Sequence, residues 1–212
     1  MPEMETIAGL VGPVPVIPVL TIEQAAVAVQ IARALVAGGL TVLEVTLRTD
    51  EALEAVTRIA AAVPEALVGV GSVIDEAQFA AARQAGARFA VSPGSTPQLE
   101  AAAHAAGLPW LPAAQSTSEV LSLRARGYRL MKFFPAESSG GVAFLRSIFG
   151  PVPDVRFCPT GGITADIARE YLALPNVACV GGSWLTPAAL VAGGKWDAIR
   201  ALARDALGMR QV

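Results

Sequence analysis

The chain of 212 residues lacks the features that mark membrane, secreted and nucleic-acid-binding proteins. Hydrophobic residues make up 53% of it, yet its apolar stretches end well short of the roughly 18 residues that a membrane span needs. The start is acidic and lacks the basic segment and apolar core of a signal peptide, so we expect none. With a net charge of −2 and no basic tract, nucleic-acid binding through phosphate neutralisation is not expected.

Cysteine and histidine are also scarce, with two residues and one residue in the chain. The two cysteines, Cys158 and Cys179, lie in apolar runs, where buried free thiols are the usual state. They provide no disulfide framework, which favours a reducing, cytoplasmic compartment. The single histidine, His104, lies in an alanine-rich helical stretch and cannot supply a typical zinc site alone. We therefore expect no metal.

Apolar runs recur along the whole chain and alternate with amphipathic helical patterns. Runs that are apolar on both faces are typical of parallel strands covered by helices. Eight such runs favour a single-domain (β/α)8 barrel over an open doubly wound sheet, with residues 1–212 as one domain and 1–12 as an N-terminal helix or arm closing the bottom. The predicted strands are Val14–Leu20, Val42–Leu47, Leu67–Val73, Phe89–Ser92, Pro109–Pro112, Leu130–Phe134, Val155–Pro159 and Val177–Gly181.

Helix starts are indicated by polar residues before the helical patterns. Thr21-x-x-Gln24 and Ser116-x-x-Glu119 have the spacing of capping boxes. Asp75 and Thr164 are predicted N-caps.

Lysine is also rare, since the sequence contains only Lys132 and Lys195. Lys195 follows two glycines and is expected to be solvated, whereas Lys132 lies in the apolar run 129–137. Burying an ammonium is costly, so burial favours the neutral, nucleophilic amine that forms a Schiff base with a carbonyl. The alternative is a strand-end lysine that reaches water or pairs with a carboxylate.

A glutamate also interrupts an apolar strand. Glu44, Thr46 and Arg48 alternate along the second predicted strand and share one face. They form either a structural ion pair or a base beside an arginine that clamps a substrate carboxylate. If Lys132 and Phe134 point into the barrel, Lys132 meets Glu44 across it and Phe134 lines the pocket.

Glycine-containing segments lie at the ends of four predicted strands. Gly69-Val70-Gly71-Ser72 and Ser92-Pro93-Gly94 allow close ligand approach but equally suit tight turns. Gly161-Gly162 and Gly181-Gly182-Ser183 follow strands seven and eight. Barrels commonly bind phosphate there, so these two turns predict a phosphate site.

Taken together, these segments resemble the 2-keto-3-deoxy-6-phosphogluconate (KDPG) and 4-hydroxy-2-oxoglutarate (KHG) aldolase family. The resemblance spans nearly the whole chain, in order. It rests on the segments Glu44-Val45-Thr46-Leu47-Arg48-Thr49, Ser92-Pro93-Gly94, Lys132-Phe133-Phe134-Pro135-Ala136-Glu137, Phe157-Cys158-Pro159-Thr160-Gly161-Gly162 and Gly181-Gly182-Ser183-Trp184.

The resemblance implies a class I, metal-independent aldolase of the Entner–Doudoroff pathway, without a cofactor and assembled as a homotrimer. It would cleave the phosphorylated 2-keto acid KDPG to pyruvate and glyceraldehyde 3-phosphate, with side activity on KHG. Lys132 would form the Schiff base and Glu44 would be the general acid and base. The resemblance also implies substrate contacts at Arg48, Ser72, Pro93, Phe134 and Thr160, and phosphate contacts at Gly161, Gly162, Gly182 and Ser183.

Two positions depart from the family pattern, and both bear on substrate preference. Position 72 is serine where threonine is usual, and the segment 112–119 lacks a glycine after Pro112 and a Thr-Pro pair.

Several other functions share parts of this pattern. A barrel isomerase or epimerase would use the glycine turns but not a nucleophilic Lys132. A metal-dependent aldolase would need several acidic or histidine ligands at strand ends, and a binding or assembly module would bind without releasing pyruvate. Within the family, the main activity could be on KHG or another 2-keto-3-deoxy acid.

Overall fold

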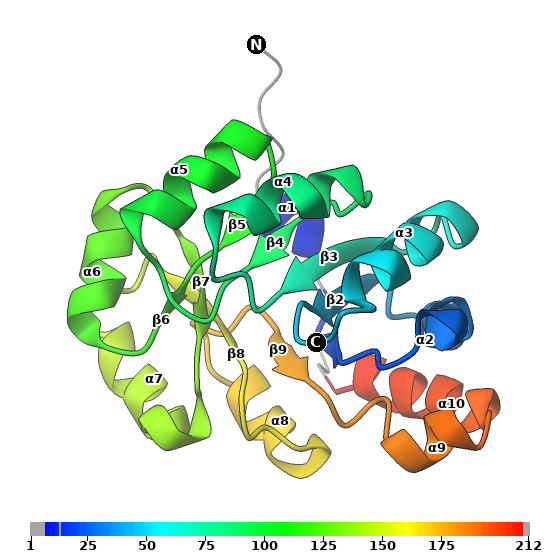
Figure 1. Ribbon diagram of the computed structural model, residues 1–212. Coiled ribbons are helices and arrows are strands. Elements are labelled where there is room, and N and C mark those ends of the chain that lie inside the picture. The colour runs from blue at the N-terminus through cyan, green and yellow to red at the C-terminus, as the bar shows by residue number, and fades with distance from the viewer. Residues whose placement is uncertain (1–6, 13, 210–212) are drawn as a thin grey trace.

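Short parallel strands alternate with helices along residues 7–12 and 14–209, the part of the chain that the computed structural model describes (Figure 1). The strands are β1 (Val16–Leu20), β2 (Val42–Thr46), β3 (Leu67–Gly71), β4 (Ala90–Val91), β5 (Trp110–Leu111), β6 (Ala113–Ala114), β7 (Leu130–Phe133), β8 (Arg156–Pro159) and β9 (Val180–Gly182). The α-helices are α1 (Ile7–Val11), α2 (Ala28–Ala37), α3 (Ala52–Ala62), α4 (Glu76–Gln84), α5 (Pro97–Ala106), α6 (Thr117–Ala125), α7 (Gly141–Phe149), α8 (Ala165–Leu172), α9 (Ala188–Ala192) and α10 (Trp196–Leu207). Two 3-10 turns, η1 (Ala25–Val27) and η2 (Glu137–Ser139), complete the series.

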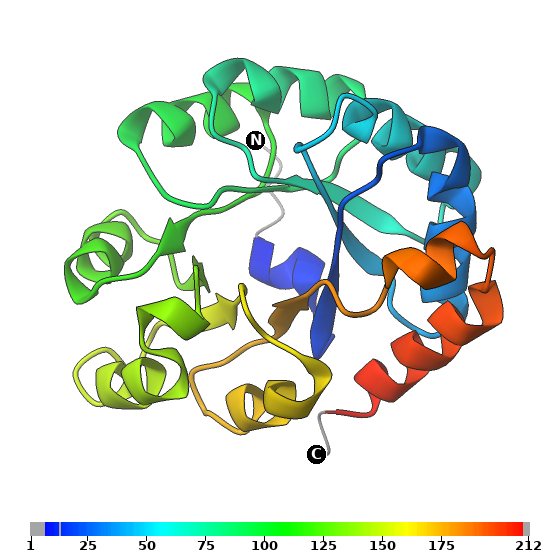
Figure 2. The same ribbon diagram turned by 60° about the horizontal axis from the view of Figure 1, so that its bottom comes forward.

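The strands close into a ring, which confirms the predicted barrel. One sheet has the order β5-β4-β3-β2-β1-β9 and the other β6-β7-β8. Parallel bridges join Phe157 to Val177 and Thr160 to Gly181, so the segment that ends in β9 lies against β8 as well as β1. Figure 2 shows the ring with helices around it.

The fifth predicted strand is interrupted. It consists of β5 and β6, which flank Pro112, and proline has no N–H to donate to a strand partner. The Pro112 carbonyl still accepts a hydrogen bond from the Lys132 N–H at 2.8 Å. The backbone of β7 therefore stays hydrogen-bonded at Lys132 in spite of the break.

Side chains fill the ring in two layers. One apolar layer lies between the strands and the helices. The other apolar layer lies inside the barrel, where Ile17, Val42, Leu130 and Cys158 of the strands pack against helix α1. α1 contributes Ile7, Leu10 and Val11 to this inner layer, and Figure 2 shows it in blue inside the ring. An N-terminal helix was predicted within residues 1–12, and α1 is that helix, while residues 1–6 lie outside the described part.

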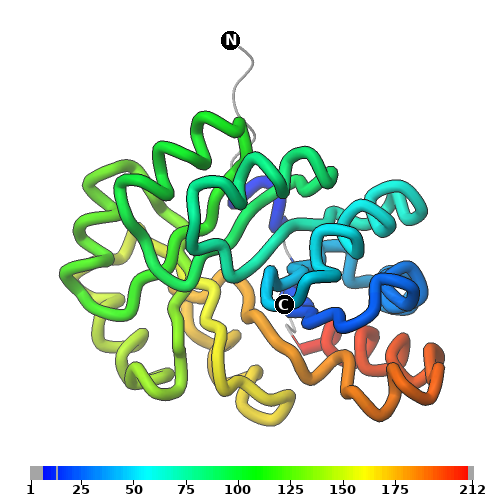
Figure 3. Tube along the Cα trace, viewed as in Figure 1, coloured from blue at the N-terminus to red at the C-terminus, as the bar shows by residue number. Residues whose placement is uncertain are grey.

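Helix α2 and the last helix, α10, pack side by side, as the blue and red parts of the trace show in Figure 3. Gly38 follows α2, and a Cβ added to it would lie 2.4 Å from the Cβ of Ala203 in α10. Glycine is therefore needed for this close approach. In the described part of the chain, no helix is both long and apolar enough to cross a membrane.

The predicted helix starts are mostly correct. Ser116 caps α6 in a reciprocal box with Glu119, Asp75 precedes α4 with its N–H bonded to Gln78, and Thr164 is the residue before α8. The predicted box at Thr21 is wrong, because α2 begins only after η1 and Gln24 makes no side-chain cap. Instead, the Thr21 hydroxyl lies 3.2 Å from the Thr46 hydroxyl.

Candidate active site

Lys132 and Glu44 meet inside the barrel, as strand alternation predicts. Lys132 on β7 follows inward-facing Leu130 by two residues, and Glu44 on β2 follows inward-facing Val42 by two. Lys132 Nζ lies 3.2 Å from Glu44 Oε1, and the two residues are only 5% and 3% exposed. A buried amine and carboxylate at this distance can exchange a proton directly.

The strand next to Glu44 is shaped to hold the carboxylate. Gly71 pairs with Thr46 on β2, and a Cβ at Gly71 would lie 2.1 Å from Glu44 Oε1. The glycine prediction at the end of the third strand therefore has a specific structural reason. Gly71 leaves the space that the Glu44 side chain occupies.

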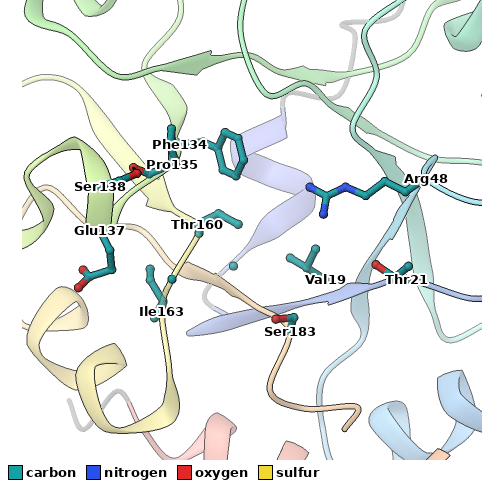
Figure 4. A pocket seen from close by; sticks show the side chains of 13 residues that line it. Val19, Thr21, Arg48, Phe134, Pro135, Glu137, Ser138, Thr160, Ile163 and Ser183 are labelled. Atoms are coloured by element: carbon teal, nitrogen blue, oxygen red, sulfur yellow. Dashed lines mark hydrogen bonds between the residues drawn. The ribbon is translucent and has the colours of Figure 1, made fainter. Parts of the chain in front are cut away.

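A cavity of approximately 520 Å³ opens at the carboxyl ends of the strands (Figure 4). The Phe134 ring lines the cavity, and its centroid lies 5.3 Å from Lys132 Nζ. The wall of the cavity contains the predicted residues Arg48, Phe134, Thr160, Gly161, Gly162 and Ser183. Residues from several strand ends thus converge on one space, as in barrels that carry out chemistry.

Arg48 is held by Ser72 rather than by Glu44. Arg48 Nε donates to Ser72 Oγ at 2.9 Å, and Ser72 has the left-handed φ of 60°. The predicted alternative of a structural Glu44–Arg48 ion pair is wrong, because Glu44 pairs with Lys132. In Figure 4 the Arg48 guanidinium points into the cavity, where it could bind a carboxylate.

The first glycine turn has a backbone that other residues rarely adopt. Gly161 and Gly162 have φ of 103° and 79°, and both line the cavity. Thr160, just before them, donates its hydroxyl proton to the Cys158 carbonyl at 3.4 Å. Glycines at positive φ with backbone N–H groups beside a cavity form the kind of nest that binds anions.

Only part of the second glycine turn, Gly181-Gly182-Ser183, lines the cavity. Ser183 lines the cavity and points into it in Figure 4. Gly182 lies within β9, where a Cβ would lie 1.8 Å from the Trp184 ring. Among the described residues, Lys132, Glu44, Gly182, Ser72 and Pro93 were predicted at the site but do not line this cavity. Lys132 lies next to it, beneath the Phe134 ring. Ser72 reaches it through Arg48.

Several cavity residues had no predicted role. They are Val19, Thr21, Pro135, Glu137, Ser138 and Ile163, whereas Gly181, which also lines the cavity, belongs to the second predicted glycine turn. The spacing to Gln24 predicts a helix cap at Thr21, whereas the position of Thr21 at the end of β1 is the signal for the site. Glu137 accepts a hydrogen bond from the Tyr171 hydroxyl, and burial together with this carboxylate raises the pKa of Tyr171. Within residues 7–12 and 14–209, no group of three or more acidic, histidine or cysteine side chains could hold a metal.

Comparison with known proteins identifies the family. A family model described as KDPG and KHG aldolase matches residues 7–202. The chain belongs to this family. The family resemblance inferred from the sequence motifs is thereby confirmed.

Curated aldolase relatives match nearly the full chain. The 2-dehydro-3-deoxy-phosphogluconate aldolase of Pseudoalteromonas atlantica is 50% identical over 91% of this chain and 90% of its own length. The KHG/KDPG aldolase of Escherichia coli K12 is 49% identical, with 91% of both chains covered.

Solved aldolase structures share the fold closely. The KDPG aldolase of Zymomonas mobilis ZM4 with 3-phosphoglycerate has a TM-score of 0.90 at 45% identity, covering 99% of each chain. The KDPG aldolase of Legionella pneumophila, with pyruvate captured as a covalent carbinolamine, has a TM-score of 0.89 at 44% identity, covering 92% of this chain and 95% of that one.

Proposed function

We propose that this chain is a class I aldolase that cleaves KDPG to pyruvate and glyceraldehyde 3-phosphate through a Schiff base on Lys132. The observation that carries the proposal is the buried contact between Lys132 Nζ and Glu44 Oε1 at 3.2 Å, next to a cavity lined by Arg48. The carbinolamine captured in the Legionella aldolase supports it, because a carbinolamine forms when an amine attacks the pyruvate carbonyl.

The first half of the reaction makes the imine. Glu44 takes a proton from Lys132, and the neutral amine attacks the C2 ketone to give a carbinolamine. Glu44 gives that proton to the carbinolamine hydroxyl, which leaves as water and yields a protonated imine that withdraws electrons from C3. Arg48 holds the C1 carboxylate, and the Phe134 ring, 5.3 Å from the amine, stabilises positive charge through its π face.

The second half breaks the carbon–carbon bond. Glu44 removes the C4 hydroxyl proton, the C3–C4 electron pair moves into the imine to give an enamine, and glyceraldehyde 3-phosphate leaves. Glu44 then returns its proton to C3, and hydrolysis of the imine releases pyruvate and regenerates Lys132. The phosphate lies on the Gly161–Gly162 turn and Ser183, with Thr160 and Pro93 beside the keto acid and Gly182 shaping the second turn.

The test is reduction with borohydride in the presence of pyruvate. Because Lys195 is exposed and is the other lysine of the chain, peptide mapping separates specific from random modification. We expect the pyruvate-derived mass on the peptide with Lys132, with Lys195 as the internal control. A chain that releases no pyruvate from KDPG and carries no adduct on Lys132 contradicts the proposal.

A second substrate, KHG, is proposed as a side activity. The name of the Escherichia coli relative, KHG/KDPG aldolase, supports it. Both substrates share the C1 carboxylate, C2 ketone and C4 hydroxyl on which the proposed chemistry depends. Comparing pyruvate release from the two under the same conditions tests this point.

We further propose that the chain works in the cytoplasm as a homotrimer. The trimer rests on the family resemblance and the compartment on the two buried free thiols, Cys158 and Cys179. Light scattering of the purified chain tests the assembly, and a dimer or monomer mass contradicts it.

A further inference from the structure

Thr21 lies where the aldehyde half of the substrate would bind. It directly follows β1 and is exposed at the cavity, and its hydroxyl points into it in Figure 4. β1 pairs with β9, with Pro18 opposite Gly182, so Thr21 and Ser183 follow the carboxyl ends of neighbouring strands. A residue there lies beside the proposed phosphate site rather than beside the Schiff base.

The direction of the hydrogen bond between Thr21 and Thr46 follows from the single hydroxyl proton of Thr46. Thr46, only 1% exposed, donates its hydroxyl proton to the Leu20 carbonyl at 3.1 Å, because a carbonyl oxygen can only accept. Thr46 therefore has no proton left for Thr21, whose hydroxyl lies 3.2 Å away. Thr21 must be the donor in that bond, which leaves only acceptor lone pairs facing the cavity.

An acceptor that faces the cavity selects a hydroxyl donor and disfavours an anion. KDPG has two hydroxyls, and the proton of the one at C4 goes to Glu44 in the proposed reaction. The hydroxyl at C5 is the remaining donor, and it is next to the C6 phosphate. KHG has a carboxylate at C5, whose oxygens accept but do not donate at neutral pH.

We propose that Thr21 is a specificity-determining residue that accepts a hydrogen bond from the C5 hydroxyl of the phosphorylated 2-keto acid and disfavours a carboxylate at that position. This inference rests on the proposed function. Thr46 acts through Thr21, as a positioning residue that accepts the hydrogen bond from its hydroxyl. The role belongs to substrate selection and leaves the Schiff-base chemistry unchanged.

The test compares two aldehydes in the synthetic direction, each with pyruvate. D-Glyceraldehyde 3-phosphate carries the hydroxyl that becomes C5–OH, and 3-oxopropyl phosphate lacks it. Thr21→Val keeps the shape of the side chain and loses the acceptor. Its kcat/KM for D-glyceraldehyde 3-phosphate should fall roughly 2- to 10-fold, as expected for one hydrogen bond, while its kcat/KM for 3-oxopropyl phosphate should stay unchanged. An unchanged ratio between the two aldehydes overturns the inference.

A matched control removes a similar hydrogen bond without changing the cavity. Thr49, which follows β2, donates its hydroxyl proton to the Ile22 carbonyl at 2.7 Å. Ile22 is the residue after Thr21 in the loop that follows β1. Thr49→Val should leave the ratio between the aldehydes unchanged, and an equal change in this variant means that loop disorder, not acceptance by Thr21, sets the ratio.

Cleavage of KHG is the second arm. Thr21→Val should raise the KHG to KDPG ratio of kcat/KM, and a fall overturns the inference. Failure of the proposed function has a different signature. The unmodified chain would then give no Lys132 adduct with pyruvate, whereas an adduct with an unchanged aldehyde ratio in Thr21→Val overturns the Thr21 inference alone.

Discussion

Gly71 lies so close to Glu44 that a Cβ on Gly71 would lie 2.1 Å from Glu44 Oε1. No Cβ tolerates a contact of that length with a carboxylate oxygen, so any larger residue must displace Glu44. The neighbouring strand β3 thereby fixes where the carboxylate can lie, and with it the 3.2 Å distance to Lys132 Nζ.

Gly71→Ala is therefore expected to damage catalysis more than folding. A displacement of about 1 Å between reacting groups can cost about 100-fold in rate, and we expect kcat for pyruvate release to fall by that order. Gly150→Ala is the control, because a Cβ there meets no atom within 4 Å. Equal kcat values in the two variants would contradict the proposed role of Gly71.

Strand alternation made the central geometry predictable. Leu130 and Lys132 differ by two residues, so a barrel interior that takes up Leu130 must also take up Lys132, and the structure confirms it. Pro112 broke the fifth strand in a way that apolarity alone does not indicate.

The misses share one cause, which is that short polar patterns have several structural solutions. The spacing of Thr21 and Gln24 suits a capping box, but Thr21 bonds across to Thr46, a residue distant in sequence. Glu137 had no predicted role because an acidic residue after a strand is usually solvated. Its partner Tyr171 lies on α8, and the pairing of the preceding strands β7 and β8 brings the two residues together.

Removing one partner of the buried pair should destabilise the fold. Lys132→Met leaves Glu44 buried without its partner, and breaking such a pair typically costs about 3–5 kcal/mol. The double variant Lys132→Met with Glu44→Leu replaces both charges and should recover much of this loss, although it stays inactive. Urea denaturation measures both, and a double variant no more stable than the single one would contradict the argument.

Ser72→Ala should weaken binding of the keto acid. It removes the acceptor that holds Arg48 Nε at 2.9 Å, so the guanidinium is no longer aimed at the cavity. We expect KM for pyruvate in the synthetic direction to rise roughly 2- to 10-fold, in line with one lost hydrogen bond. Ser72→Thr keeps the hydroxyl but places a β-branched residue at φ 60°, so it should lower stability while preserving KM.

Acid should remove a contribution of Glu119 to stability. The N–H groups of Gln115 and Ser116 and the Ser116 hydroxyl donate to its carboxylate and lower the pKa of Glu119 below 4.5. A lowered folded-state pKa stabilises the fold fully above pH 4.5, and this stabilisation is lost as the pH falls through the folded-state value. Glu119→Gln keeps the box without the charge. Its stability relative to the unmodified chain should therefore rise on acidification, and a constant difference across the pH range would be inconsistent with this.

Tyr171→Phe should affect phosphorylated substrates selectively. The Tyr171 hydroxyl donates to Glu137, whose N–H donates to the Gly161 carbonyl at 3.2 Å and whose side chain packs against Gly162. Without the hydroxyl, the Glu137 side chain is free to move away from the glycine turn. KM for KDPG should then rise roughly 2- to 10-fold, as expected for one hydrogen bond, while KM for KHG stays near its original value.

The chain supplies a matched control for this variant, because it has one other tyrosine, Tyr128. Tyr128 precedes β7 at the opposite end of the barrel, where it interacts with Glu100. Tyr128→Phe loses the same phenolic hydroxyl and should leave both KM values unchanged. The ratio of the two KM values is the decisive measurement. A structural defect lowers activity on both substrates together, whereas loosening of the phosphate turn raises the KM of the phosphorylated substrate alone.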